Sequence, residues 1–426
     1  METLGLFAIF FGLLVLGAPI IICLGLSSAF YIFMAGVPMA VVPQKVFSGM
    51  DSFVLLTLPG FILAGGLMNG GDITRRIIDF SNSLFGNIRG GLGFANVGGS
   101  LIFGGISGTA VADTASIGSV MIPGMARNGY DKPFAAAITA ASSTIGPIIP
   151  PSLPMIIAGS LTGISIGRMF LAGAIPGLLL AAGMMLTCYL IALKKGYPRH
   201  GWVGFPKLFH DFKSALWAIL LTFIILFGIT GGVFTPTEAS MVAVLYALVV
   251  GLFVYKGLTP KSIVELIFDA AKLSASLMLL IGVSNLFGWV LTSEQIPKAI
   301  ASYILSITEN KFLILLILNV LLLIVGTFME TIAALVILFP TLLAIAVGVD
   351  VDPVHFGIIA VLNLMIGLTT PPMGICLFVA SSISKVPVME VVRAIIPFLI
   401  CNLCVLLLVT YLPFLSLWLP NLIMGE

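Results

Sequence analysis

The chain has 426 residues, of which 60% are hydrophobic and 8% are charged, whereas soluble domains have about 25% charged residues. The net charge is +2 and the basic residues are scattered over short loops, so the charge gives no indication of nucleic-acid binding, and we expect no nucleic-acid partner. Apolar runs near the length of a membrane span recur along the whole chain, so we expect an all-α polytopic membrane protein. These runs are Leu4–Phe33, Phe53–Leu67, Phe170–Leu193, Leu216–Thr230, Met241–Val254, Leu313–Val325 and Ile395–Leu419.

Residues 1–50 are predicted to form N-terminal scaffold helices, and charged loops farther along the chain predict their orientation. The densest polar stretch, residues 194–213, has five Lys or Arg residues. The positive-inside rule makes it a cytoplasmic loop. Working outward from it, most basic residues lie on the cytoplasmic side, and both termini lie outside.

A first transport repeat is predicted over residues 51–193. It begins with an amphipathic arm suited to the membrane interface, with Ile73, Ile77, Leu84 and Ile88 on one face. The charge count then requires Gly91–Gly124 to enter from the cytoplasm and return. We therefore expect a re-entrant helical hairpin whose tip is GGISGTAVAD, residues 104–113.

A helix break follows the hairpin at STIGPIIPPSLP, residues 143–154. Each internal proline removes a backbone donor and clashes one turn back, at a cost of ~3 kcal/mol or more. Lipid cannot satisfy the freed carbonyls, so such backbone is tolerated only inside protein or beside a water-filled cavity. A kink used only for packing is the alternative reading.

A second repeat is predicted over residues 261–394, after further scaffold helices at 214–260, and a C-terminal helix follows at 395–426. Sliding the sequence by 221 positions brings Ile145-Gly-x3-Pro-Pro onto Ile366-Gly-x3-Pro-Pro. Sliding it by 217 brings Asp113-Thr114 onto Glu330-Thr331. The second arm has Ile296, Ile300, Tyr303 and Ile307 on one face. The second re-entrant hairpin is Leu313–Ala346, entered from outside, with its tip at residues 326–331.

Inverted repeats with broken helices are typical of secondary transporters. Unwound backbone offers carbonyl oxygens to a small cation, and half-helix N-termini offer N–H groups to an anion. We therefore interpret the tips and breaks as parts of a binding site. Four breaks in two matching pairs fit this interpretation better than packing alone.

Several side chains at the breaks are candidates for binding. Hydroxyl groups there can ligate Na⁺ or form hydrogen bonds with a substrate; the alternative is that they only cap helices. The residues that carry these hydroxyl groups are Ser107, Thr109, Ser152, Thr369 and Thr370. Asp113 and Glu330 are carboxylates at membrane depth, which by default indicates function. Both also suit capping, Asp113 in a first turn and Thr327-x-x-Glu330 as a capping box.

At these motifs the chain resembles the large membrane (M) subunit of tripartite ATP-independent periplasmic (TRAP) transporters. The most specific element is GGVFTPTEA, residues 231–239, in which we read Thr237 and Glu238 as caps of a helix beginning near Ala239. The resemblance implies an elevator-type secondary transporter in the bacterial inner membrane, driven by sodium. It also implies two partners, a small membrane (Q-type) subunit and an extracytoplasmic (P-type) substrate-binding protein. Na⁺ as coupling ion is the only cofactor expected.

The resemblance also implies where ions and substrate bind. Sodium would lie between each tip and its neighbouring break: Ser107 and Thr109 with Gly146 and Pro150, and Gly326 and Met329 with Thr369 and Thr370. The substrate anion would lie between the tips, near Ser107, Ser152 and Glu330, with Asp113 a further candidate.

Family substrates are organic acids. Overall likeness favours sialic acid, with C4-dicarboxylates as the alternative. An ion or solute channel is the rival of another class, although a channel would need rings of like residues around a pore. The sequence has no HExxH, no G-x-S-x-G with a partnered His and no P-loop, so we expect no enzyme.

Overall fold

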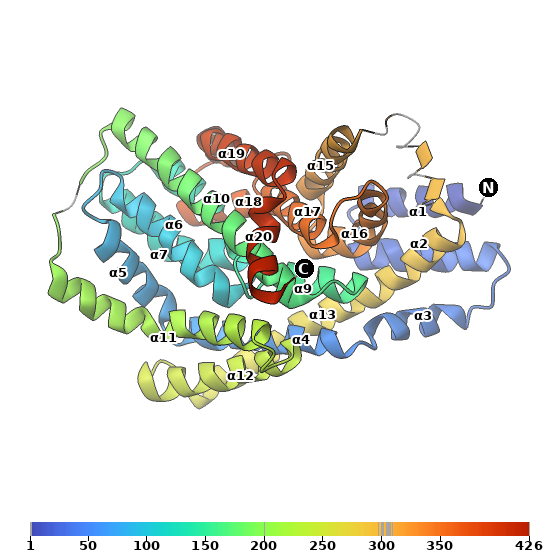
Figure 1. Ribbon diagram of the computed structural model, residues 1–426, viewed down its shortest axis with the longest axis horizontal. Coiled ribbons are helices and arrows are strands. Elements are labelled where there is room, and N and C mark those ends of the chain that lie inside the picture. The colour runs from blue at the N-terminus through green and yellow to red at the C-terminus, as the bar shows by residue number, and fades with distance from the viewer. Residues whose placement is uncertain are drawn as a thin grey trace.

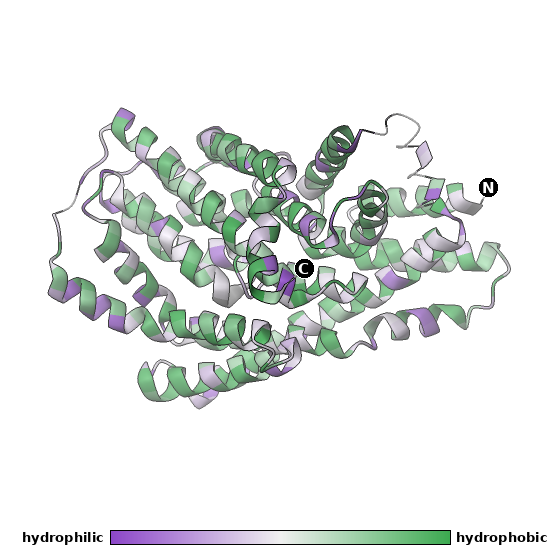
Figure 2. Ribbon diagram, in the orientation of Figure 1, coloured by the Kyte–Doolittle hydropathy of each residue, from purple (hydrophilic) through white to green (hydrophobic). Residues whose placement is uncertain are grey.

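In the computed structural model every regular element is a helix within the part that the structure describes, residues 2–199, 201–296, 298–299, 302–303, 308 and 310–425. Of Glu2, Ile106 and Ser107 it describes the backbone alone. Apolar residues predominate along the helices (Figure 2). A helix satisfies its own backbone hydrogen bonds, so it is the form that suits apolar segments in lipid.

The N-terminal run forms two short helices, α1 (Glu2–Val15) and α2 (Ile20–Met34), followed by α3 (Val41–Met50). Both α2 and α3 pack against α13 (Pro260–Ser293), at the right of Figure 1. With 14 and 15 residues, α1 and α2 are shorter than the ~20 residues that cross a bilayer.

The first repeat contains the predicted arm, hairpin and broken helix. After a 3₁₀ turn (Phe53–Leu56), its helices are α4 (Thr57–Gly70), α5 (Ile73–Phe85), α6 (Gly91–Ser107), α7 (Ala110–Arg127), α8 (Lys132–Ser142), α9 (Leu153–Thr162) and α10 (Ile166–Lys195). The arm is α5, which ends before Ile88 and buries Ile73 and Ile77. Only Gly108 and Thr109 separate α6 from α7, which makes the two helices a hairpin.

The middle of the chain differs from the expectation at two helix starts. α11 (Phe205–Thr230) begins inside the stretch 194–213 that was predicted to be loop. Pro206 stands in its first turn, where a backbone N–H has no acceptor within the helix and its absence in proline costs nothing. α12 (Pro236–Val249) begins three residues before Ala239 and continues as a π-helical turn (Val250–Val254).

The second repeat has the same order of elements as the first. It comprises α13, which begins at Pro260, then α15 (Lys311–Phe328), α16 (Thr331–Val347), α17 (Pro353–Gly367), α18 (Ile375–Ser384) and α19 (Val388–Tyr411). The starts of α15 to α19 follow those of α6 to α10 at a nearly constant interval, which agrees with the 221-position shift to within one position. The 217-position match of Asp113 with Glu330 is therefore wrong. Most of the second arm, including Ile300 and Ile307, lies outside the described residues.

The C-terminal stretch is not one helix from residue 395, as expected. α19 begins earlier, at Val388, and ends at Tyr411, and a separate α20 (Phe414–Met424) follows. Pro413 explains the interruption, because a proline disfavours helical backbone at the residue before it.

Within the described residues, seven helices are long and apolar enough to cross a membrane, or eight if the bent pair Lys132–Ile148 and Leu153–Thr162 is one span. The pair bends by 40° at the predicted break. Of the hairpin helices only α15 passes this test.

The two repeats interlock at the centre of the molecule (Figure 1). The helix after each break packs against the second hairpin helix of the other repeat, so that α9 contacts α16 and α18 contacts α7. This reciprocal packing brings both tips and both breaks into one core.

Candidate binding site at two helix breaks

The first hairpin crosses the first break through two glycines. A Cβ atom on Gly104 of α6 would lie 2.1 Å from the Cα atom of Gly146. The backbones therefore touch, which only glycine permits. Sequence reasoning named Gly146 but missed Gly104, although Gly104 stands in the quoted tip motif.

Backbone oxygens of the break face the hairpin tip. The carbonyl oxygen of Pro150 lies 2.9 Å from the Cβ position of Gly105, and that of Pro151 lies 3.6 Å from the Cβ position of Gly108. Gly108 closes α6 with a φ of +64°, a left-handed conformation that glycine adopts without strain. The break and the tip thus form one unit lined by main-chain atoms.

Asp113 faces this unit from the first turn of α7. The side chain is fully buried, and its Oδ2 atom would lie 2.1 Å from a Cβ atom on Gly146. The carboxylate therefore lies against the broken backbone.

The hydroxyl-bearing candidates of the first repeat have different positions. Ser152 is the N-cap of α9: its Oγ accepts from the backbone N–H of Met155 at 3.3 Å and donates to the carbonyl of Pro147. Capping is thus an actual role of Ser152. Thr109 has extended backbone at the N-cap position of α7. The side chain of Ser107 lies outside the described residues.

The second hairpin crosses the second break in the same way. A Cβ atom on Gly367 would lie 2.4 Å from the carbonyl carbon of Gly326. The shift of 221 positions that revealed the repeat takes Gly146 to Gly367, so the sequence match also marks this glycine. Thr369 and Thr370 follow Gly367 by two and three positions, and both hydroxyls donate to the carbonyl of Ile366, at 2.9 and 2.8 Å. Their lone pairs keep room for a cation.

At the second tip the expected capping box is wrong. Thr327 belongs to α15 and donates to the carbonyl of Ile324, so it does not cap α16. Glu330 is itself the N-cap, accepting from the N–H groups of Ile332 at 2.9 Å and Ala333 at 3.2 Å. Met329 is extended and joins the two helices.

The two tips and two breaks contain no Lys or Arg. Four half-helices begin there, at Ala110, Leu153, Thr331 and Ile375. Their N-termini carry partial positive charge, and at α9 and α16 the side chains of Ser152 and Glu330 already accept from first-turn N–H groups. The site therefore offers oxygens to cations and helix ends to an anion, but no basic side chain.

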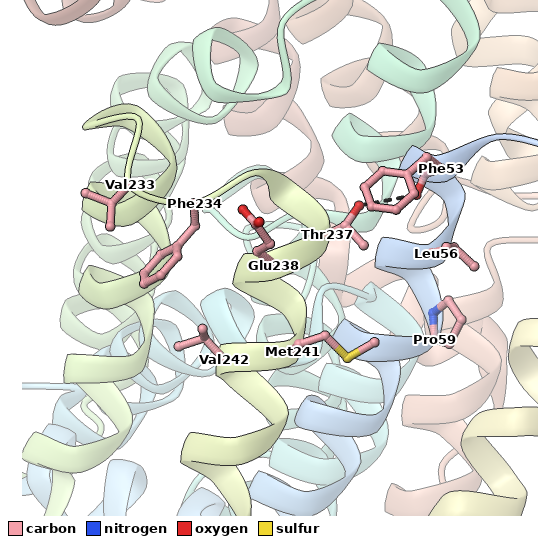
Figure 3. A pocket seen from close by; sticks show the side chains of 9 residues that line it. All are labelled: Phe53, Leu56, Pro59, Val233, Phe234, Thr237, Glu238, Met241 and Val242. Carbon is pink, nitrogen blue, oxygen red and sulfur yellow. Dashed lines mark hydrogen bonds between the residues drawn. The ribbon is translucent and has the colours of Figure 1, made fainter.

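The GGVFTPTEA segment lines an apolar cavity of about 790 Å³ between the starts of α4 and α12 (Figure 3). Thr235 and Glu238 form a full capping box, which confirms Glu238 as a cap. Thr237 does not cap the helix: its hydroxyl contacts Thr57 Oγ1 at 3.2 Å and donates to the carbonyl of Phe53 at 3.2 Å. The motif thus joins α12 to α4.

Residues 7–415 match the family described as "DctM: Tripartite ATP-independent periplasmic transporter, DctM component". The chain is 42% identical over 415 residues to the sialic acid TRAP transporter large permease protein SiaM of Vibrio cholerae, with 97% of each chain covered. It is also 42% identical over 377 residues to the C4-dicarboxylate TRAP transporter large permease protein DctM of Pseudomonas aeruginosa, with 88% of each chain covered. The solved YdaH transporter of Alcanivorax borkumensis shares the fold at 14% identity, with a TM-score of 0.64 over 89% of this chain and 88% of that one.

Proposed function

The chain belongs to the DctM component family of TRAP transporters, and we propose that it is the large membrane subunit of a sodium-coupled importer of organic acids. It is a multi-pass membrane protein, and its relatives are transporter permeases rather than enzymes. The observation that carries sodium coupling is the paired crossing of a hairpin and a broken helix, with oxygens and no basic side chain.

Charge supports the coupling. An organic acid is an anion, and the site adds the carboxylates of Asp113 and Glu330, while the tip and break segments contribute no Lys or Arg. Two like charges within a few ångströms in a medium of low dielectric constant repel strongly. Bound Na⁺ ions offset this repulsion, and the half-helix N-termini add to their effect.

In this proposal one Na⁺ lies at each crossing. The first is held by the tip at Ser107 and Thr109 and by the break at Gly146 and Pro150. The second is held by Gly326, Met329, Thr369 and Thr370. Backbone carbonyls supply most ligands, since hard oxygen atoms suit a hard cation. The substrate anion lies between the tips, near Ser107, Ser152 and Glu330, with Asp113 a further candidate.

Two partners complete the transporter, a small membrane subunit and an extracytoplasmic substrate-binding protein. A transport domain of hairpins and broken helices moves against the scaffold as an elevator in the bacterial inner membrane, with both chain termini outside. Within the family we favour sialic acid as substrate. C4-dicarboxylates are the alternative, because the two relatives named above are equally identical to the chain.

Uptake by the assembled three-component system in proteoliposomes tests the proposal. Radiolabelled N-acetylneuraminate and succinate are compared, each with and without an inward Na⁺ gradient. We expect accumulation of N-acetylneuraminate only with the gradient. Equal uptake without the gradient would contradict sodium coupling. Accumulation of succinate but not of N-acetylneuraminate would show that the substrate is a C4-dicarboxylate.

A further inference from the structure

Each repeat has a buried polar contact one turn before its glycine crossing. In the first repeat, Ser142 at the end of α8 donates to Asn96 Oδ1 at 3.1 Å and accepts from Ser100 at 2.8 Å. Both partners lie on α6, and all three side chains are at most 1% exposed. We call these three residues the first clamp.

In the second repeat, the amide nitrogen of Asn363 on α17 donates to Asn319 Oδ1 on α15. Asn319 donates in turn to Thr410 Oγ1 on α19 at 3.0 Å. Asn319 and Asn363 form the second clamp, and both are at most 2% exposed.

The two clamps occupy equivalent places. The shift that takes Gly146 to Gly367 also takes Ser142 to Asn363. Ser142 and Asn363 each stand four residues, about one helical turn, before the crossing glycine. In both repeats the clamp ties the first hairpin helix to the helix that breaks.

Apolar contacts alone would not fix the position of the first hairpin helix along the helix that breaks. Between helices in lipid there is little hydrophobic driving force, so interhelical hydrogen bonds and close backbone contacts fix their positions. Ion ligands must keep their places within a few tenths of an ångström. A slip of one residue along a helix is about 1.5 Å. Such a slip is enough to move the Gly104–Gly146 or Gly326–Gly367 contact out of place.

We propose that Ser142 and Asn363 are positioning residues, which hold the two glycine crossings in register and thereby set the apparent affinity for the coupling ion. This inference rests on the proposed function, because it assigns the clamps to the sodium sites proposed there. Neither residue is a ligand in it; each acts through the backbone one turn away.

The test measures uptake against Na⁺ concentration in the assembled transporter, together with the Na⁺-induced rise in melting temperature of the purified chain. Asn363→Leu fills the space without a hydrogen bond. Asn363→Ser reproduces the Ser–Asn contact of the first clamp and serves as the rescue. Asn402→Leu is the matched control, because Asn402 is a fully buried asparagine on α19 whose polar atoms have no hydrogen-bond partner among the described residues.

Asn363→Leu and Ser142→Ala should each raise the half-saturating Na⁺ concentration by about fivefold, because each removes the side-chain hydrogen bonding between the helix that breaks and the first hairpin helix. Asn363→Ser and Asn402→Leu should stay near wild type. If Asn363→Leu does not fold, the test rests on Ser142→Ala, because this substitution removes only one oxygen atom. If the folded variants keep the wild-type Na⁺ dependence, or if Asn402→Leu shifts it equally, the positioning role of Ser142 and Asn363 is wrong, and the proposed function is unaffected. A wild-type transporter without Na⁺ dependence overturns both the clamps and the proposed function.

Discussion

The backbone of Gly104 touches that of Gly146: a Cβ atom on Gly104 would lie only 2.1 Å from the Cα atom of Gly146. The obstacle is main chain, so no side-chain rotation can relieve it. The contact joins the first hairpin to the first break and holds the backbone oxygens of the break near the tip.

Gly104→Ala should therefore push α6 away from the break and abolish Na⁺-dependent uptake. Overpacking of a tight contact costs about 1–3 kcal/mol, so the melting temperature should fall as well. Gly124→Ala is the control, because a Cβ atom there has nothing within 4 Å. This control should keep uptake and melting temperature. Normal Na⁺-dependent uptake by Gly104→Ala would show that the crossing has no part in ion coupling.

The second crossing allows a graded test with one pair of residues. A Cβ atom on Gly367 meets the carbonyl carbon of Gly326 at 2.4 Å, whereas a Cβ atom on Gly326 has its nearest contacts at 3.3 Å. Gly367→Ala should thus abolish Na⁺-dependent uptake, and Gly326→Ala should only weaken it. Uptake against Na⁺ concentration ranks the two, and the reverse order would mean that the crossing has a different geometry.

The breaks and the repeat were predictable because proline and glycine act locally on the backbone. The stretch STIGPIIPPSLP and the equivalent residues 366–374 interrupt their helices whatever the tertiary structure around them. The nearly constant interval between helix starts follows from the same sequence match. Pro206 and Pro413 likewise mark a helix start and a helix interruption, but charge counts and apolar runs do not take prolines into account.

Contacts between distant segments were not predictable in this way. Nothing local marks Gly104 as the residue that meets Gly146, since the tip has several glycines. The clamp partners Asn319 and Asn363 are likewise defined only by tertiary packing. That Glu330 caps its half-helix was predictable, but the form of the cap was not: Thr327 fits the capping-box pattern, yet the preceding helix extends to Phe328 and holds Thr327 in its last turn.

The capping box at α12 yields a prediction about stability rather than transport. Glu238 accepts from the N–H of Thr235 at 2.8 Å, and Thr235 Oγ1 accepts from the N–H of Glu238 at 3.3 Å. Thr235→Ala should cost about 1 kcal/mol and lower the melting temperature, with the Na⁺ dependence of uptake unchanged. Thr235→Ser keeps the hydroxyl and should match the wild type. A change in Na⁺ dependence without loss of stability would give this motif a direct role in transport.

An ion pair at the end of α10 gives a small dependence of stability on pH. The Lys195 ammonium contacts Asp131 and holds the pKa of that carboxyl below its usual value. The side chains are 49% and 51% exposed, so the pair contributes about 0.5 kcal/mol. Because the folded-state pKa is the lower one, this stability is present above the unfolded pKa and is lost as pH falls through the folded one.

Melting temperatures of the wild type and Asp131→Asn should accordingly differ at pH 7 and converge as the pH falls below about 4. Lys195→Met is the complementary variant, and it should show the same convergence. A difference that persists at low pH would mean that Asp131 stabilises the loop by packing rather than by charge.

Glu330 allows helix capping to be separated from charge. Its carboxylate caps α16 through the N–H groups of Ile332 and Ala333, and the amide oxygen in Glu330→Gln can accept the same bonds without the negative charge. A carboxylate charge in the neighbourhood of a bound cation contributes on the order of 2 kcal/mol at an effective dielectric constant of about 20. Glu330→Gln should therefore keep the melting temperature but need at least about tenfold more Na⁺ for half-maximal uptake. Glu330→Ala loses the cap as well, so both quantities should change. If Glu330→Gln retains the wild-type Na⁺ dependence, the carboxylate only caps the helix, and charge at this tip has no part in sodium coupling.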